Sequence, residues 1–222
     1  MAIQFIPKPH PLPAIPICDE LFSFVCGFKD FLEPTITVLG IRRFRTSNII
    51  RVIETVPSCS PVLSHYLLSR FVSLLNMFYD VDDNIVGDRR GKFLELIGQR
   101  MGAYTLTGEY SVILEANAYI NGNSISDHDA DIVFQNDDVD VVECKSCLRN
   151  WLPGNPLPRL VRAKLNFLKE IMDHVGATNH NCSVYLLTYL AEDALVGHIL
   201  RPAGFGAFIV KAKPDILGKL CV

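Results

Sequence analysis

Residues 126–146, with the sequence S-D-H-D-A-D-I-V-F-Q-N-D-D-V-D-V-V-E-C-K-S, place acidic side chains inside two runs of β-branched residues. The runs 131–134 and 139–142 flank the turn-forming residues Gln-Asn-Asp-Asp. β-Branched runs on either side of such a turn predict a β-hairpin. Charge therefore enters strands whose other residues are those of a buried core, and the chain is expected to be organised around this hairpin.

The length of the hairpin loop decides which of the charged side chains meet. Alternate side chains of a strand share a face. If the loop is residues 136–138, Asp131 lies opposite Glu143 and Asp129 lies opposite Lys145, with all four on one face. A loop one residue shorter or longer reverses this relation.

The pairing of Asp131 with Glu143 points to a divalent cation. Two adjacent carboxylates repel each other, and burial strengthens the repulsion unless a positive charge neutralises it. Mg²⁺ or Mn²⁺ suits one or two carboxylates, with the backbone carbonyl of Cys144 as a further ligand. Lys145 would then help to deprotonate an attacking water or balance negative charge on a phosphate.

These residues resemble the motif of the PD-(D/E)xK nuclease superfamily. The matching residues are Asp131, the run V-V-E-C-K at 141–145, and the run G-K-F-L-E at 91–95, similar to the helix that carries a further glutamate. Ala130 stands where a proline often precedes the aspartate. The resemblance covers residues 88–212 and is greatest to nuclease domains of CRISPR-accessory effectors and restriction-type enzymes. It implies Asp131, Glu143, Lys145 and Glu95 as catalytic residues.

The expected fold is α/β: a restriction-endonuclease-like α/β/α sandwich with a mixed central sheet, preceded by a mainly helical N-terminal region. The expected division is into residues 1–87, which begin with a proline-rich extended arm, and residues 88–222. A polar loop at 80–90 is the predicted boundary. Besides the hairpin, helices are predicted at 17–32, 61–79, 91–103, 159–175 and 191–200, and strands at 35–39, 112–120, 183–190 and 207–210.

Glu95 belongs to a stripe of the helix predicted at 91–103 that also holds Gly91, Gly98 and Gly102. Residues three and four apart lie on one helix face. Glycines there would let the helix approach the sheet and bring Glu95 to the metal ligands Asp131 and Glu143. The alternatives are a solvent-facing Glu95, or replacement of its role by Glu109 or Glu115.

Basic residues supply the predicted contacts with nucleic acid. The net charge of −3 excludes a broad basic coat, so binding is expected to use local patches and metal ions. An ordinary solvated loop or helix face is the alternative for each patch. The predicted contact residues are Arg42, Arg43 and Arg45 beside Phe44, Arg149 in a loop with Trp151, and Arg162 on the helix at 159–175. On that helix Leu160 is expected to face inward, and Arg162, Lys164 and Lys169 are expected to face outward.

The composition of the chain bears on its cellular compartment and on its oligomeric state. The 222 residues include seven scattered cysteines, which predict reduced thiols in a cytoplasm, and no signal peptide or membrane span is expected. The helix at 61–79 has a broad apolar stripe, which indicates core packing or a homodimer interface.

We expect a divalent-metal-dependent endonuclease, with DNA as the first expected substrate and a restriction, defence or DNA-processing role. One alternative is a catalytically silent nuclease-fold protein that binds nucleic acid or a protein partner. Others are a nuclease of RNA or single strands, and a structural acid and lysine cluster in a different class of protein. No Walker loop, G-x-G-x-x-G or Ser-His-Asp arrangement supports another common enzyme class.

Overall fold

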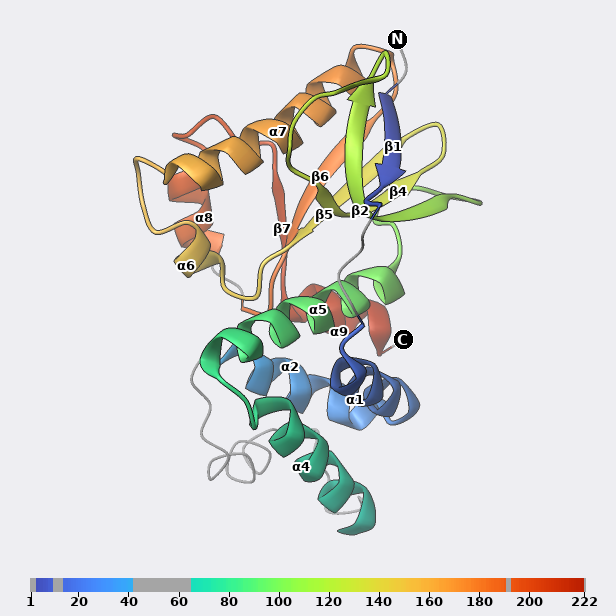
Figure 1. Cartoon of the computed structure of the whole chain (residues 1–222), viewed down its shortest axis with the longest axis vertical. Helices are drawn as coiled ribbons and strands as arrows, with labels where there is room; N and C mark the ends of the chain where they lie inside the picture. The colour runs from blue at the N-terminus through green and yellow to red at the C-terminus, as the bar shows by residue number, and fades with distance from the viewer. Residues whose placement is uncertain (1–2, 10–13, 42–64, 191–192, 222) are drawn as a thin grey trace.

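A computed structural model describes residues 3–9, 14–41, 65–190 and 193–221 (Figure 1). The predicted contacts Arg42, Arg43 and Arg45 lie outside the described residues. Within these residues the helices are α1 (Pro16–Gly27), η1 (Lys29–Phe31), α2 (Leu32–Gly40), α4 (His65–Tyr79), α5 (Asp83–Met101), α6 (Leu148–Trp151), α7 (Arg159–Gly176), α8 (Asp193–Leu200) and α9 (Lys213–Leu220).

The described strands form one mixed open sheet of seven strands, so the protein is α/β as expected. Their order is β1-β2-β4-β5-β6-β7, with β3 paired to β2. β1 through β5 pair antiparallel, whereas β5, β6 and β7 are parallel. The strands are β1 (Ile3–Pro7), β2 (Ser111–Ile120), β3 (Asn123–Ser124), β4 (Ala130–Gln135), β5 (Val139–Cys144), β6 (Cys182–Leu187) and β7 (Ile209–Lys211).

The hairpin of β4 and β5 has the predicted three-residue loop. Gln135 pairs with Val139, and Ile132 pairs with Val142. The loop is closed by Asn136, whose backbone N–H donates to the Asp138 carbonyl at 3.1 Å. The three-residue loop is therefore confirmed. The last paired residues are Ile132 and Val142, so the facing of Asp131 and Glu143 one pair further along stays a prediction.

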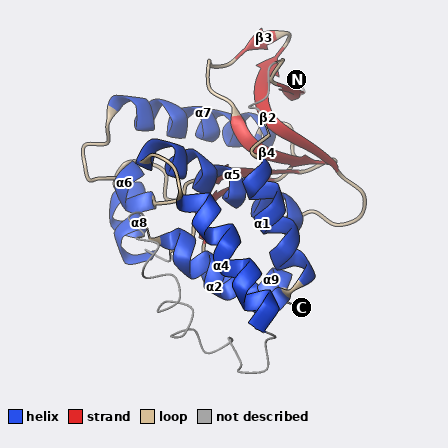
Figure 2. Ribbon diagram, turned by 60° about the horizontal axis from the view of Figure 1, so that its bottom comes forward, coloured by secondary structure: helices blue, strands red, loops and turns tan. Residues whose placement is uncertain are grey.

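Helices cover both faces of the sheet (Figures 1 and 2). On one face, α7 packs its buried residues Leu165 and Leu168 against a cluster that includes Val133 and Val141. On the other face, α5 and α9 pack against the alternate residues of the same strands, and α1, α2 and α4 join this second core. The two-residue period of each strand supplies both cores from one sheet.

Residues 35–39, predicted as a strand, belong to helix α2 (Leu32–Gly40), so that prediction was wrong. Pro34 was expected to end a helix but lies in the first turn of α2, where a proline is tolerated because the N–H there has no intrahelical partner. Ile36, Val38 and Leu39 are fully buried. Burial on several sides suits a helix as well as a strand, and packing overrides their β propensity.

The predicted polar loop at 80–90 was also wrong, because α5 begins at Asp83. The boundary proposed at residue 87 therefore falls inside a helix. The core on the α5 face contains residues from both sides of that boundary, including Phe71 of α4 and Val142 of β5. The division into regions 1–87 and 88–222 stays a prediction.

Gly98 is the glycine at which α5 closely approaches the sheet. A Cβ at this position would lie 2.7 Å from the Ile132 side chain, whereas a Cβ at Gly91 would meet nothing within 4 Å. The predicted close approach is thus confirmed at Gly98 and wrong at Gly91. Gly102, with φ of +68°, instead follows the end of the helix.

We expect Gly91→Ala to raise the free energy of unfolding and Gly98→Ala to leave it unchanged or lower it. Alanine gains about 1 kcal/mol over glycine within a helix, so Gly91→Ala should stabilise the protein. At Gly98 overpacking costs about 1–3 kcal/mol and offsets or exceeds that gain. Urea denaturation of both variants measures the difference, and equal stabilities would contradict the close approach.

Candidate active site: an acid and lysine cluster at the ends of β4 and β5

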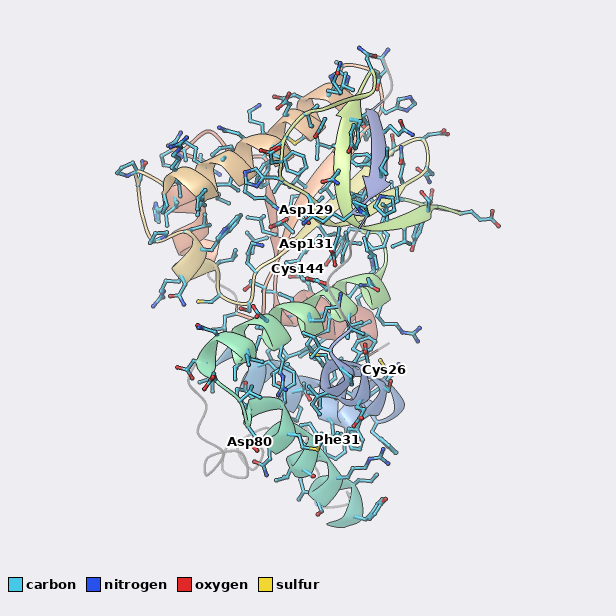
Figure 3. The ribbon with its side chains drawn as sticks, in the orientation of Figure 1. Cys26, Phe31, Asp80, Asp129, Asp131 and Cys144 are labelled. Atoms are coloured by element: carbon cyan, nitrogen blue, oxygen red, sulfur yellow. The ribbon has the colours of Figure 1, made fainter. Side chains whose placement is uncertain are left out.

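Asp131 marks the end of the hairpin's backbone pairing. The last paired residues are Ile132 and Val142, and beyond them the Cys144 backbone N–H donates to Asp131 Oδ2 at 2.6 Å. The carboxylate thus takes the place of a backbone acceptor and is fixed between the two strands. Figure 3 places Asp129, Asp131 and Cys144 where the strands meet α5.

Glu143 is completely buried and lies between two lysines. Lys145 Nζ is 2.5 Å from its Oε1, and Lys164 Nζ is 3.0 Å from its Oε2. Lys145 Nζ also lies 3.8 Å from Asp131 Oδ2. A buried carboxylate is strongly disfavoured without such partners, and the two lysines supply the positive charge that this position requires. The predicted grouping of Asp131, Glu143 and Lys145 is therefore present.

Lys164 was predicted to face solvent, which was wrong. Its side chain is only 12% exposed, and its ammonium also donates to the backbone carbonyl of Asp129. Arg162, the predicted basic residue of this helix, is exposed, and Leu160, predicted to face inward, is 78% exposed. The missed signal was spacing: Lys164 precedes the buried Leu168 by four residues and shares its face.

Asp129 is paired with Lys8, which comes from the far end of the sequence. Lys8 follows β1, and its Nζ lies 2.8 Å from Asp129 Oδ2. Burial opposes the charge of Asp129, but the hydrogen bond from Lys8 and the charge of Lys164 outweigh it, so its pKa is lowered. The sequence predicted Asp129 opposite Lys145, but Asp129 instead pairs with Lys8 and Lys164. The part of the N-terminal arm that the structure describes at residues 3–7 is extended as strand β1, and Lys8 after it contributes a side chain to the cluster.

Burial alone shifts the pKa values of Asp131 and Lys145 in opposite directions. Burial, and then the charge of Glu143, raise the pKa of Asp131 to about 6. For Lys145 burial favours the neutral amine, but the charges of Glu143 and Asp131 outweigh it and raise its pKa. At neutral pH Lys145 therefore remains an ammonium, while the negative charge of Asp131 is incompletely compensated.

Glu95 lies beside Asp131, as predicted. Both line a cavity of about 460 Å³ together with Cys144 and Lys145. Lys92 Nζ is 3.0 Å from Glu95 Oε2, yet burial outweighs this partner and raises the pKa of Glu95.

The two alternatives to Glu95 differ in position. Glu115 is 8% exposed on β2, in a left-handed conformation with φ of +47°, and its charge acts on Glu95 and Lys92. Glu109 is exposed and does not line the cavity. Glu115 therefore adds negative charge to the Glu95 side of the site, whereas Glu109 does not.

The donor atoms at this cavity suit a hard divalent cation. Asp131 and Glu95 are oxygen donors whose pKa values are raised first by burial and then by neighbouring carboxylates, and a bound cation would offset both effects. Each Glu143 oxygen lies at ion-pair distance from a lysine, yet among the described residues neither accepts a hydrogen bond. A metal ion would therefore compete with Lys145 and Lys164 for these oxygens. Among the described residues, no three or more His, Cys, Asp or Glu side chains are already grouped to hold a metal ion.

Lys145 is also held by the short helix α6. Its Nζ lies 5.3 Å from the centre of the Trp151 ring, within the range of a cation–π contact. Arg149, predicted to contact nucleic acid, is on the same helix and is exposed. The loop that the sequence singled out for its tryptophan therefore contacts the site directly.

The fold and site define an α/β protein with a mixed sheet and an acid and lysine cluster at its central strand ends. No protein-family model matches the chain, and no curated protein sequence matches it significantly. In the part of the chain that the structure describes, no helix is both long and apolar enough to cross a membrane.

Proposed function

We propose that this protein is a divalent-metal-dependent nuclease of the PD-(D/E)xK type, with a restriction-endonuclease-like fold and DNA as its substrate. The observation that carries the proposal is the meeting of Asp131, Glu143 and Lys145 at adjacent strand ends, beside a cavity that Glu95 also lines. A cytoplasmic homodimer acting in restriction, defence or DNA processing completes the proposal.

The order of the elements supports the fold assignment. Helix α5 with Glu95 precedes β2, then β4 with Asp131, and then β5 with Glu143, which Lys145 follows one residue after the strand ends. Helix α7 then crosses to β6, which pairs parallel with β5. This is the order that the resemblance implies, and the chain contributes Lys164 on α7, where a basic residue near the phosphate is expected.

In the proposed mechanism each side chain of the cluster has a separate role. Asp131 and Glu95 would hold Mg²⁺ or Mn²⁺, which would supply Lewis-acid activation of water and phosphate. Lys145, as an ammonium, orients the attacking water and balances charge that develops on the phosphate. Glu143 fixes the ammonium of Lys145 and joins the metal ligands if a lysine moves. Lys164 holds Glu143 in place.

A second candidate is a purely structural ion cluster. It is favoured by the pairing of both Glu143 oxygens, at 2.5 Å from Lys145 and 3.0 Å from Lys164. A buried carboxylate with two ammonium partners requires no metal. This alternative therefore predicts that Mn²⁺ does not bind.

The proposal is tested by incubating the protein with supercoiled plasmid, linear duplex, single-stranded DNA and RNA in EDTA, Mg²⁺ or Mn²⁺. We expect cleavage that requires metal and is lost in Asp131→Ala and Lys145→Ala, because positioned acid–base groups contribute about 10²–10⁴-fold in rate. Lys169→Ala is the matched control, since this lysine of α7 pairs with Asp173 on the surface and lines neither the cavity nor the acid and lysine cluster.

Two results would count against a nuclease. Cleavage by Lys145→Ala at the wild-type rate would show that the activity arises elsewhere. Absence of cleavage, together with absence of Mn²⁺ binding in calorimetry, would favour the structural cluster or a silent binding protein. Gel filtration with light scattering tests the homodimer separately.

A further inference from the structure

A second cavity adjoins the one that holds Asp131 and Glu95. Its volume is about 530 Å³, within the range of small-molecule sites. The two cavities share Gly87, Asp88, Lys145 and Ser146 as lining residues. They therefore lie on either side of the Lys145 side chain, between α5 and the chain segment that follows β5.

The lining of the second cavity combines one aromatic ring with uncharged and acidic hydrogen-bonding groups. Trp151 supplies the ring, and Asn84 and Asn150 supply amides. Asp83 and Asp88 are carboxylates that only accept hydrogen bonds when ionised. These acceptors suit a planar, neutral ring with amino groups at its edge, whereas Lys145, which also lines the cavity, is the group that an adjoining phosphate would approach.

The guanidinium of Arg90 does not reverse this preference. Arg90 lines the cavity but is buried, with Nε donating to the Leu39 carbonyl at 2.6 Å. Its Nη2 donates to the carbonyls of Gly40 and Ser146 at 3.4 and 3.3 Å. These bonds hold the guanidinium against the protein backbone, so the walls remain those of a site for a neutral ring.

We infer that this cavity binds one unpaired nucleobase of the strand being cut, stacked on Trp151, while the adjacent phosphate lies beside Lys145. The inference rests on the proposed nuclease function and adds its substrate class. A base within a duplex cannot enter a side cavity without leaving its stack. The preferred substrate is therefore single-stranded nucleic acid, or an unpaired end or flap.

Trp151 allows a direct test because it is the single tryptophan of the chain. Its fluorescence is measured in EDTA, without cleavage, while a 12-mer of deoxycytidylate is added. We expect this strand to quench the fluorescence, because a bound cytosine would stack on Trp151 and donate hydrogen bonds from its amino group to the carboxylates of the cavity. An abasic 12-mer and a blunt duplex of the same length should leave the fluorescence nearly unchanged.

Variants test the energetic role of the ring. Base stacking on an aromatic side chain corresponds to roughly 5–150-fold in affinity, so Trp151→Ala should weaken binding of a labelled 12-mer at least about fivefold. Trp151→Phe retains a ring and should lose much less. Tyr66→Ala is the control, because Tyr66 is an aromatic residue of α4 that is 70% exposed and lines neither cavity.

The possible outcomes separate this inference from the nuclease proposal. Metal-dependent cleavage with equal quenching by abasic and normal strands would overturn the base site and leave the nuclease. Base-dependent quenching without cleavage under any metal condition would retain the site and overturn the nuclease. If Trp151→Ala fails to fold by circular dichroism, the wild-type fluorescence and the phenylalanine variant still decide the question.

Discussion

Replacing Asp131 by asparagine is expected to abolish cleavage and, at the same time, to stabilise the folded protein at pH 8. Its pKa of about 6 exceeds the ordinary 3.8 because the charged form is buried near Glu143. The neutral amide avoids that cost and can still accept the hydrogen bond from Cys144. One pKa unit corresponds to about 1.4 kcal/mol. From the rise in the pKa of Asp131 we therefore expect the variant to gain about 1–3 kcal/mol in the free energy of unfolding.

The pH dependence of this effect has a defined sign. Because the folded pKa of Asp131 is raised, the native state binds more protons than the unfolded state between pH 4 and pH 6. The contribution of Asp131 to stability therefore falls as pH rises through this window. Thermal unfolding of wild type and Asp131→Asn in EDTA should diverge from pH 4 to pH 7 and differ by a constant amount above it.

Adding Mn²⁺ to the wild type and to Asp131→Asn tests separately whether Asp131 is a metal ligand. If Asp131 is a ligand, Mn²⁺ at pH 8 should raise the melting temperature of the wild type, because a ligand that binds only the native state stabilises it. It should not raise that of Asp131→Asn. Unfolding curves of the two proteins that coincide at every pH would contradict the unfavourable burial of Asp131.

Replacing Lys164 by methionine is expected to cost about 3–5 kcal/mol in the free energy of unfolding, the range for removing one partner of a buried ion pair. Glu143 is completely buried and would retain only Lys145. Lys169→Met is the matched control on the same helix. Its pair with Asp173 is exposed, so we expect a loss below about 1 kcal/mol.

A double variant separates loss of charge balance from loss of packing. Lys164→Met combined with Glu143→Gln removes the uncompensated charge and should recover part of the stability that Lys164→Met loses. Chemical denaturation of the four proteins measures the coupling between the two residues. Equal losses in Lys164→Met and Lys169→Met would mean that Lys164 does not stabilise Glu143.

The sequence alone determined the central hairpin and the grouping of its charges. The β-branched runs, the turn residues and the two-residue period of strands are local, and a three-residue loop then predicts Asp131 opposite Glu143. The helical spacing of Glu95 and Gly98 likewise follows from residues close together in the chain. Each of these predictions depends on contacts within one strand pair or one helix.

Tertiary structure alone decided which side chains complete the cluster. Lys8 comes from the N-terminal arm and Lys164 from helix α7, both far in sequence from Asp129 and Glu143. Helical spacing indicates the inward face of Lys164, but only the packed chain shows which carboxylate it meets. The same reason explains residues 35–39, whose β-branched sequence forms helix α2 because neighbouring helices bury it. Burial and ion pairing join residues far apart in the sequence, and their energies depend on the packed chain.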